Sequence, residues 1–403
     1  MSTPNKPTIL FVAEAVTLAH FARIITLAKS LDPSKYDIVV ASDPRYLGLE
    51  KPFPFAFHPI QSIPSSQFTQ ALAEGKPVYD VRTLTQYVEE DLLLLNKIKP
   101  DLVVGDFRLS LSISAPLAQV PYAAVVNAYW SPYADIVYPI PDLMLTKLLG
   151  VKLAQKVFNA VRPLVFALHA RPLNKARQRF GLQSLKHDLR EAYTSADFTL
   201  YTDIPEAVPM VQKPSSHHYL GPVLWSTNTP LPEWWDNLPD DKPIVFVTLG
   251  SSGQSELLPM VLQALAELPL TIIAATADKI HLTDLPDNVF INDYLPFDIA
   301  CQRSQAVISN GGSMTTYQAF ASGVPVIGIA GNMDQLLNMQ AIEHLGAGIT
   351  LRADSVSQTG IQKAIKALLN NPSYALAAKK ITQTLVHYDP AQRFRKIVTD
   401  IID

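Results

Sequence analysis

The chain has 403 residues, of which 48% are hydrophobic and 17% charged, and its formal net charge is -3. This length exceeds one ordinary hydrophobic core, so we expect two domains, and the composition argues against extended disorder. The charge offers no basic excess for nucleic-acid binding. The single cysteine, Cys301, excludes a disulfide framework and fits a reducing compartment.

The apolar run Thr8–Ala13 near the N-terminus is interrupted by Glu14 and is too short for the apolar region of a signal peptide. No uninterrupted apolar stretch reaches the ~20 residues that span a bilayer. We therefore expect a cytoplasmic protein that is at most peripheral to the inner face of the membrane.

Short apolar runs alternate with helical patterns in the first half of the chain. The expected strands are Thr8–Ala13, Asp37–Ala41, Asp101–Gly105, Tyr122–Asn127 and Asp197–Tyr201. The expected helices between them include Leu18–Leu31, Asp80–Ile98 and Leu109–Gln119. Near-continuous apolar strands separated by helices predict βαβ units and a parallel sheet covered on both faces.

The region 220–243 breaks this alternation with five prolines and three tryptophans. Proline fixes φ and removes a backbone donor, so we predict a stiff connector here. The predicted boundaries are an N-terminal domain over 1–222, a linker over 223–243 and a C-terminal domain over 244–386. His217 and His218, just before this region, are expected in a loop.

The alternation then resumes. The expected strands are Ile244–Thr248, Leu270–Ala275, Asn288–Ile291, Ala306–Ser309, Pro325–Ala330 and Ile349–Leu351. The expected helices are Glu256–Leu268, Ser313–Ser322, Asp334–Leu345, Val356–Leu369 and a final helix in 387–403. The sequence thus predicts two Rossmann-like, doubly wound α/β domains, with ligands bound in a cleft that both domains face.

A Gly-Gly turn, Gly311-Gly312, separates the expected strand ending at Ser309 from the helix that begins near Ser313. Such a turn directs free backbone N–H groups and the positive end of the helix outward, which suits a diphosphate. The hydroxyl groups of Ser313 and Thr315 can add donors.

The stretch around this turn resembles the donor signature of the UDP-glycosyltransferase family, including its bacterial macrolide-type members, which have the two-domain GT-B fold. The matching positions are Asn310, Gly312, Thr315, Gln318, Gly323-Val324-Pro325, Asp334-Gln335 and Asn338. Asn310 and Gln318 stand where the family has histidine and glutamate. The resemblance implies sugar contacts by Asp334 and Gln335, whose carboxylate and carboxamide suit hydroxyls that both donate and accept.

Two further segments resemble the same family. Thr248-Leu249-Gly250-Ser251 is similar to the loop in which a serine approaches the diphosphate, and Asp293-Tyr294-Leu295-Pro296 is similar to the base-binding loop. The implied donor-binding residues are Ser251, Tyr294, Leu295, Asn310, Gly311, Gly312, Ser313, Thr315, Gln318, Asp334 and Gln335. The resemblance also implies that the final helix, in 387–403, packs back on the N-terminal domain.

A histidine, His20, follows the first expected strand, whose carboxyl end should face the cleft. Histidine suits a general base near neutral pH, and the run His20–Leu31 resembles the family segment that carries this base. Asp106, at the end of the strand that begins near Asp101, matches the acidic partner that would fix the tautomer of the ring. Asp101 itself is expected to be a turn residue. The resemblance implies a His20–Asp106 dyad and inversion by direct displacement.

No His, Cys or carboxylate spacing suggests a metal site, so we expect no metal and no cofactor besides the nucleotide-sugar co-substrate. The tract Lys147–His187 holds nine Lys and Arg residues among apolar ones and no Asp or Glu. It suits either docking on an anionic membrane or a helical subdomain with solvated lysines that lines the acceptor pocket, and we favour the subdomain.

Together these features predict an inverting glycosyltransferase. It would move a sugar from a UDP- or TDP-type nucleotide-sugar to a hydroxyl of a small apolar, natural-product or lipid acceptor. The Phe and Tyr content of the loops in 52–79 and 129–149 indicates an apolar, aromatic acceptor. Two alternatives stay open: a weakly active or non-catalytic sugar-nucleotide-binding homologue, and a nucleotide-sugar epimerase. No feature of the sequence indicates an oligomeric state.

Overall fold

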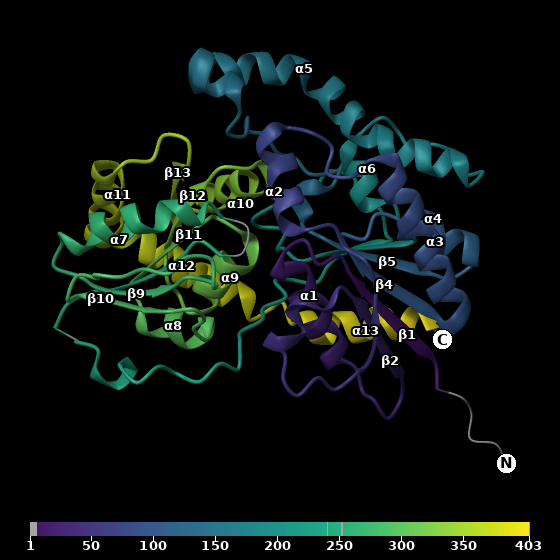
Figure 1. Cartoon of the computed structure of the whole chain (residues 1–403), viewed down its shortest axis with the longest axis horizontal. Helices are drawn as coiled ribbons and strands as arrows, with labels where there is room; N and C mark the ends of the chain where they lie inside the picture. The colour runs from purple at the N-terminus through teal and green to yellow at the C-terminus, as the bar shows by residue number, and fades with distance from the viewer. Residues whose placement is uncertain (1–5, 240, 251–252, 403) are drawn as a thin grey trace. The chain divides into compact units, whose positions relative to one another are not determined.

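The computed structural model describes residues 6–239, 241–250 and 253–402. Contacts divide the chain into two units (Figure 1). Unit 1 comprises Met1–Val137, Gln155–Val223 and Tyr388–Asp403, and unit 2 comprises Tyr138–Ala154 and Leu224–His387. Each unit is built on one parallel sheet with helices, which confirms the predicted class of two doubly wound α/β domains.

The sheet of unit 1 has the strand order β3-β2-β1-β4-β5-β6-β7. Its strands are β1 (Thr8–Ala13), β2 (Asp37–Ser42), β3 (Ala56–Pro59), β4 (Leu102–Asp106), β5 (Tyr122–Val126), β6 (Phe198–Tyr201) and β7 (His217–Tyr219). The five predicted strands form within one residue of their expected bounds. The expectation of a loop at His217-His218 is wrong, because both residues pair with β6 as an edge strand. Three residues are too few to show a strand period in sequence.

Alternate residues of β1 face opposite sides of this sheet, as a pleated strand requires. Phe11 packs with the helices on one side, where its ring centroid lies 5.9 Å from that of Phe394. Leu10 and Val12 pack on the other side with Leu94. The helices of this unit are α1 (Leu18–Ser30), α2 (Ser65–Glu74), α3 (Val81–Ile98), α4 (Leu111–Ala118), α6 (Leu189–Thr194) and α13 (Pro390–Ile402). The 3₁₀ helices are η1 (Pro44–Leu49) and η2 (Ala128–Trp130).

The C-terminal helix α13 is part of unit 1 and lies beside α1 (Figure 1). The chain reaches it through a close contact with Gly221, whose φ is +91° and where a Cβ would stand 2.6 Å from the Cβ of Tyr388. Only glycine fits both the backbone conformation and this approach. Arg393 donates to the carbonyl oxygen of Tyr219 at 3.0 Å, which ties α13 to the end of β7.

The sheet of unit 2 has the strand order β10-β9-β8-β11-β12-β13. Its strands are β8 (Ile244–Thr248), β9 (Thr271–Ala275), β10 (Val289–Asn292), β11 (Ala306–Ser309), β12 (Val326–Ala330) and β13 (Gly348–Arg352), all within one residue of expectation. Its helices are α7 (Leu258–Ala266), α8 (Phe297–Arg303), α9 (Ser313–Ala321), α10 (Met333–His344), α11 (Gln358–Asn370) and α12 (Pro372–Leu385), with 3₁₀ turns η3 (Trp235–Asn237) and η4 (Ser255–Leu257).

The proline-rich stretch does not stand apart from unit 2. Trp235 is buried, and its carbonyl oxygen accepts a hydrogen bond of 2.6 Å from Arg303, whose guanidinium also lies over the indole ring. Trp234 donates from Nε1 to the carbonyl oxygen of Ile291. The prolines stiffen this segment, and its tryptophans hold it against the α/β core.

One long helix, α5 (Met144–Arg179), covers most of the basic tract. It contains a break at Gly150, where φ is 69° and ψ is 157°. Contacts assign its first residues to unit 2 and the part from Gln155 onward to unit 1. Among the helices of the described residues, none is long and apolar enough to cross a membrane.

Candidate active site

Each sheet changes the direction of its winding at one point. In unit 1 this point lies between β1 and β4, because β2 and β3 extend the sheet to one side before the chain returns. In unit 2 it lies between β8 and β11. Ligands of open α/β sheets bind beside the carboxyl ends of the strands at such points. The predicted catalytic residues follow β1 and end β4, and the predicted phosphate-binding turn follows β11.

His20 and Asp106 are brought together in unit 1. The last residue of β1, Ala13, pairs with Asp106 at the end of β4, and α1 begins five residues later with His20 in its first turn. Nδ1 of His20 lies 2.7 Å from Oδ1 of Asp106. The carboxylate is buried, whereas the imidazole retains 15% exposure. The pair therefore has the geometry expected from the sequence.

Arg23, one turn further along α1, completes this group and was missed in sequence. Its Nε and Nη2 donate to both carboxylate oxygens of Asp106, at 2.7 and 2.9 Å. Its Nη1 donates to Oδ1 of Asn127 at 2.8 Å. The spacing of three residues from His20 on one helix was the available signal, since such residues share a face. Asp106 is thus held by a bidentate, charge-assisted pair.

This arrangement fixes the tautomer of His20. Nδ1 lies 2.7 Å from a carboxylate oxygen of Asp106, which only accepts, and 3.0 Å from Nη2 of Arg23, which only donates. An unprotonated Nδ1 would place its lone pair against the carboxylate of Asp106, which repels it. Arg23 does not need Nδ1 as an acceptor, because it already donates to that carboxylate. We therefore assign the proton to Nδ1, which donates to Asp106. Within the described residues, Nε2 of His20 has no hydrogen-bond partner and keeps its lone pair.

A cluster of aromatic side chains lies against one face of the His20 imidazole. Phe107, with a left-handed φ of 59°, stacks on His20 with ring centroids 4.7 Å apart and planes within 8°. Phe107 in turn contacts the rings of Phe68, Tyr79 and Tyr193, and Tyr193 contacts Trp130. Aromatic side chains at this position provide an apolar surface next to the imidazole of His20.

A buried charged network supports the carboxyl ends of β1 and β4. Arg108, fully buried, donates to Oε2 of Glu14 at 3.0 Å, to Oδ1 of Asp91 at 3.1 Å and to the carbonyl oxygen of Gln61 at 2.6 Å. Burial raises the pKa of the Glu14 carboxyl, an effect that exceeds the opposing attraction of Arg108. Because Arg108 follows Phe107 directly, these contacts fix the turn that carries both Asp106 and Phe107.

In unit 2, the glycine turn between β11 and α9 forms as predicted, but the N–H groups of its two glycines are not free. The N–H of Gly311 donates to Oγ of Ser309 at 3.0 Å. Gly311 has a φ of +78°, and a Cβ there would lie 2.7 Å from Cγ of Met339. Oδ1 of Asn310 accepts from the N–H of Gly312 at 3.0 Å. Asn338 donates from Nδ2 to the carbonyl oxygen of Gly311 at 2.8 Å and to Oγ1 of Thr316 at 2.9 Å. The buried amide of Asn338 therefore locks the turn, a role that its place in the motif did not reveal.

The loops after β8 and β10 lie at the same edge of the sheet. A Cβ on Gly250 would stand 3.5 Å from Nδ2 of Asn310, so the loop after β8 passes beside the turn. The predicted residue Ser251 in that loop lies outside the described residues. Tyr294 contacts the carbonyl oxygen of Ala277 at 3.4 Å through its hydroxyl. Leu295 is fully buried, so any contact with a nucleobase would come from its backbone.

Of the residues on α9, Gln318 is the most informative. Gln318 and Thr315 are buried and Ser313 is half-buried. Among the described residues, Oε1 of Gln318 has no hydrogen-bond partner, although it is buried. Buried polar atoms in native proteins are almost always bonded, so this oxygen is suited to a ligand donor such as a hydroxyl.

Asp334 and Gln335 open α10, and the structure gives Gln335 a local role. Its Oε1 accepts from the N–H groups of Gly331 and Asn332, while its own N–H donates to Oδ1 of Asn332. This is a capping box, which satisfies the free donors at the helix start. A contact between Gln335 and a sugar would therefore use its amide nitrogen.

Asp142 lies beside the same helix start and was missed in sequence. Its N–H donates to the carbonyl oxygen of Gly331 at 2.8 Å, and its carboxylate pairs with Arg352 and accepts from the N–H of Asp354 at 2.9 Å. Burial raises the pKa of Asp142 to about 6 despite Arg352. No local pattern could have revealed it, since its partners lie some two hundred residues away in the chain.

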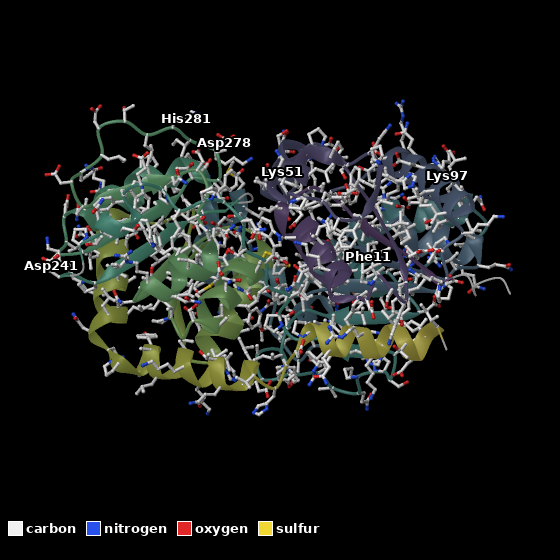
Figure 2. The ribbon with its side chains drawn as sticks, turned by 90° about the horizontal axis from the view of Figure 1, so that it is seen from below. Phe11, Lys51, Lys97, Asp241, Asp278 and His281 are labelled. Atoms are coloured by element: carbon white, nitrogen blue, oxygen red, sulfur yellow. The ribbon has the colours of Figure 1, made fainter. Side chains whose placement is uncertain are left out.

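Two other features contain none of the predicted site residues, although Asp293 in the first of them directly precedes Tyr294. Asp278 and His281 lie close together on the surface of unit 2, and with Asp293 they bring ligand atoms within 4.8 Å of one another (Figure 2). The sequence gave no sign of this group because its members are spread over sixteen positions. All three are exposed, and exposed acidic groups of this kind are common without an ion.

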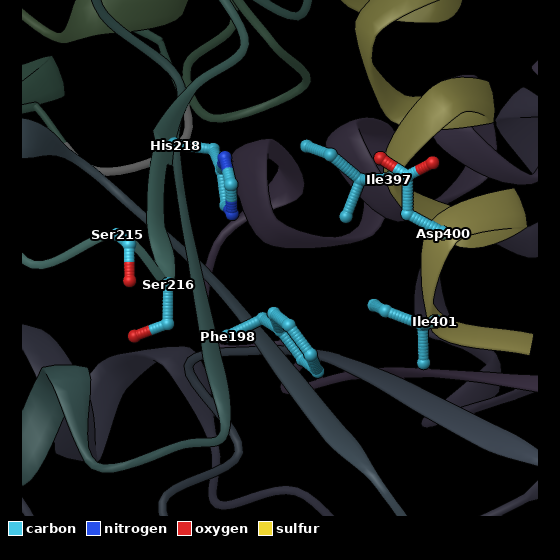
Figure 3. Close-up of a pocket in the computed structure, with 7 residues that line it drawn as sticks. All are labelled: Phe198, Ser215, Ser216, His218, Ile397, Asp400 and Ile401. Atoms are coloured by element: carbon cyan, nitrogen blue, oxygen red, sulfur yellow. The ribbon is translucent and has the colours of Figure 1, made fainter.

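A hollow of about 250 Å³ in unit 1 is lined by Phe198, Ser215, Ser216, His218, Ile397, Asp400 and Ile401 (Figure 3). Phe198 begins β6, and Ser216 directly precedes β7. The hollow is therefore at the amino edge of the sheet, opposite His20 and Asp106.

The chain is similar to known proteins in both sequence and fold. Residues 259–398 match the model of the erythromycin biosynthesis protein CIII-like C-terminal domain. The chain is 52% identical over 373 residues to a PGL/p-HBAD biosynthesis rhamnosyltransferase of Mycobacterium bovis, covering 93% of this chain and 83% of the relative.

Solved structures share the fold. The spinosyn forosaminyltransferase SpnP matches with a TM-score of 0.71 at 18% identity, covering 99% of this chain and 100% of SpnP. The spinosyn rhamnosyltransferase SpnG complexed with thymidine diphosphate matches with a TM-score of 0.66 at 17% identity, covering 97% of this chain and 99% of SpnG.

The two parallel-sheet units and these structural matches define the GT-B fold. With the identity to the mycobacterial relative, they show that the chain belongs to the bacterial macrolide-type glycosyltransferases, as its donor signature predicted. The protein is a glycosyltransferase.

Proposed function

We propose that this glycosyltransferase moves a rhamnosyl group from a thymidine-diphosphate-type donor to an aromatic hydroxyl acceptor of the PGL/p-HBAD kind, with His20 as the general base. The single observation that carries this proposal is the buried Asp106 holding Nδ1 of His20 at 2.7 Å. The rhamnosyl group and the acceptor kind are suggested by the name of the 52% identical relative, and the nucleotide by the SpnG complex.

The proposed step balances as a direct displacement. The acceptor oxygen forms a bond to the anomeric carbon as the bond from that carbon to the diphosphate oxygen breaks. The acceptor proton passes to Nε2 of His20, and the electron pair leaves with the nucleoside diphosphate. The new imidazolium is stabilised by Asp106, while Arg23 keeps that carboxylate in place. Attack from the side opposite the leaving group inverts the configuration.

Donor binding is assigned to the carboxyl edge of the unit 2 sheet. The N–H groups of the first turn of α9, which begins at Ser313, would bind the diphosphate at the positive end of the helix. The N–H groups of Gly311 and Gly312 already donate within the turn, to Oγ of Ser309 and Oδ1 of Asn310, and so would hold its shape. The unpartnered Oε1 of Gln318 would accept from a ribose hydroxyl. Asp334 would contact hydroxyls of the transferred sugar.

The aromatic group around Phe107 suits an aromatic acceptor. Phe68 and Tyr79 are buried, while Phe107, Trp130 and Tyr193 keep part of their surface exposed. Rings of an acceptor gain from edge and stacked contacts with such side chains. A hydroxyl on that acceptor would then approach Nε2 of His20.

The test is acceptor-dependent release of nucleoside diphosphate. The protein is incubated with TDP-rhamnose, UDP-glucose or UDP-galactose, with and without a p-hydroxybenzoate ester, and the product anomer is assigned by NMR. The expected result is release of TDP only with TDP-rhamnose and the acceptor, with the configuration inverted. Tight TDP binding without turnover on any acceptor would instead favour the non-catalytic interpretation. A UDP-sugar preference or a retained configuration would contradict the donor or the mechanism.

A further inference from the structure

Helix α5 carries apolar side chains that no part of the described chain covers. Of the sixteen large apolar side chains that are exposed in the described residues, nine lie on α5. Within unit 1 they form a stripe of Val157, Val161, Leu164 and Leu168, with exposed fractions of 37%, 39%, 63% and 49%. Their spacing of four, three and four residues places them along one face of the helix. We call these four residues the α5 stripe.

The α5 stripe is not the face by which the helix packs on unit 1. That packing is made by Phe158, Phe166 and Leu173, which are almost fully buried. The α5 helix is therefore apolar on two faces. An ordinary surface helix of the same unit, α13, buries Phe394 and Val398 and presents charged residues such as Arg395 and Lys396 to solvent. A surface helix that is apolar on its outer side needs a partner on that side.

The charge around the α5 stripe identifies the kind of partner. Nine of the chain's 33 Lys and Arg residues lie between Lys147 and His187, and no Asp or Glu does, although the whole chain is negative. Lys156 stands beside Val157, and Arg171 and Lys175 continue the line of the stripe by three and seven residues beyond Leu168, all three exposed. Apolar residues flanked by exposed cations are the pattern of helices that lie in the interface of an anionic membrane.

A second copy of the chain fits this surface less well. Two α5 stripes that faced each other would bring the flanking cations of both copies together, and like charges at close range repel. We infer that α5 docks this enzyme on an anionic lipid surface, with the α5 stripe inserted among the acyl chains and its cations on the headgroups. This inference goes beyond the proposed transfer reaction and holds whichever sugar is transferred.

Vesicle flotation tests the inference directly. Wild-type protein is mixed with phosphatidylcholine vesicles, or with vesicles that contain about 30% phosphatidylglycerol, at about 50 and 500 mM salt, because salt screens the headgroup attraction. We expect binding to the anionic vesicles that weakens at high salt, and at least tenfold weaker binding for Leu164→Glu/Leu168→Glu. Lys156→Glu/Arg171→Glu should lose the preference for anionic lipid.

The matched control is Leu93→Glu on α3. Leu93 is 74% exposed and lies in the same unit, but it is not part of the α5 stripe. This variant should bind vesicles as the wild type does. Circular dichroism and TDP-rhamnose turnover with a soluble acceptor confirm that each variant is folded and active, so that loss of lipid binding is separated from loss of the proposed chemistry. Three results would each overturn the inference. They are wild-type binding that does not depend on anionic lipid, vesicle binding by Leu164→Glu/Leu168→Glu equal to that of the wild type, and a wild-type dimer that these two substitutions dissociate.

Discussion

Asp106→Asn tests the catalytic group most sharply, because one atom changes. The carboxylate is buried and accepts from His20 and from two nitrogens of Arg23. The amide keeps one acceptor oxygen but turns an NH₂ group toward a donor. It therefore leaves the buried guanidinium of Arg23 without its counter-charge and allows the wrong tautomer of His20.

Both effects have a working magnitude. Removing one partner of a buried ion pair costs about 3–5 kcal/mol, and the remaining oxygen places this case near the lower value. A domain with ~5–15 kcal/mol of stability stays folded after such a loss. Loss of a correctly oriented general base lowers rates by roughly 10²–10⁴, so we expect kcat to fall about 10³-fold, or about 4 kcal/mol in the barrier.

The assay is acceptor-dependent TDP release, with TDP affinity measured by calorimetry on the same samples. TDP affinity should stay unchanged, since the proposed donor contacts lie in unit 2. The matched control is Asp101→Asn at the other end of the same region of chain. Asp101 is exposed, and its carboxylate only accepts from the N–H of Thr8 at 2.7 Å, so the rate should change less than about threefold.

The combination with His20→Ala sharpens the result. If His20 and Asp106 act as one unit, the double variant should be no slower than the slower single variant. A folded Asp106→Asn enzyme with a rate within about threefold of the wild type would refute the assignment of His20 as an Asp106-oriented base. If the rate losses of the two single variants multiplied in the double variant, that result would refute the assignment as well.

Three further predictions concern other parts of the chain. Gly311→Ala places a Cβ on a left-handed backbone and 2.7 Å from Cγ of Met339. Calorimetry should therefore show at least tenfold weaker TDP binding, and denaturation should show a loss of about 1–3 kcal/mol in the free energy of unfolding. Unchanged TDP affinity would exclude the turn as the diphosphate site. Burial lowers the pKa of His217 to about 4, below its unfolded value near 6.5. The neutral ring is therefore favoured in the fold, and up to about 3 kcal/mol of stability is present above pH 6.5 and lost as pH falls toward 4. Urea denaturation should show a smaller pH dependence for His217→Gln, and equal slopes would contradict this. Burial raises the pKa of the Cys301 thiol to about 12. A thiol reagent at pH 8 should therefore label Cys301 only after urea is added. Rapid labelling of the native protein would contradict this prediction.

The sequence by itself determined most strands of both parallel sheets and the position of the glycine turn that is proposed to bind the donor. Strands such as Ile244–Thr248 are buried on both faces, so their apolar runs are continuous and their bounds are visible without the fold. The turn at Gly311 is likewise local, because it depends on glycines at fixed distances from a strand end. The edge strands β3 and β7 were not predicted, since a short edge strand has no such run.

Tertiary structure decided most of the contacts between distant side chains, although the resemblance to a family had already implied the pair His20 and Asp106. Asp106 reaches His20 across 86 positions because β4 returns beside β1 in the sheet. Arg23, which the sequence did not reveal, is identified as the third member only by its contacts with that carboxylate. The same holds for Glu14 with Arg108 and for Asp142 with Arg352, since pairing of buried charges depends on chain crossings rather than on neighbours in sequence.

The α5 helix shows this division most clearly. Its basic and apolar composition was visible in the sequence, and from composition alone solvated lysines on a packed subdomain were the favoured interpretation. Only the folded chain separates Phe158 and Phe166, which are covered, from Leu164 and Leu168, which are not. Whether an apolar side chain is buried depends on what packs against it, and that is a property of the tertiary structure rather than of the residue.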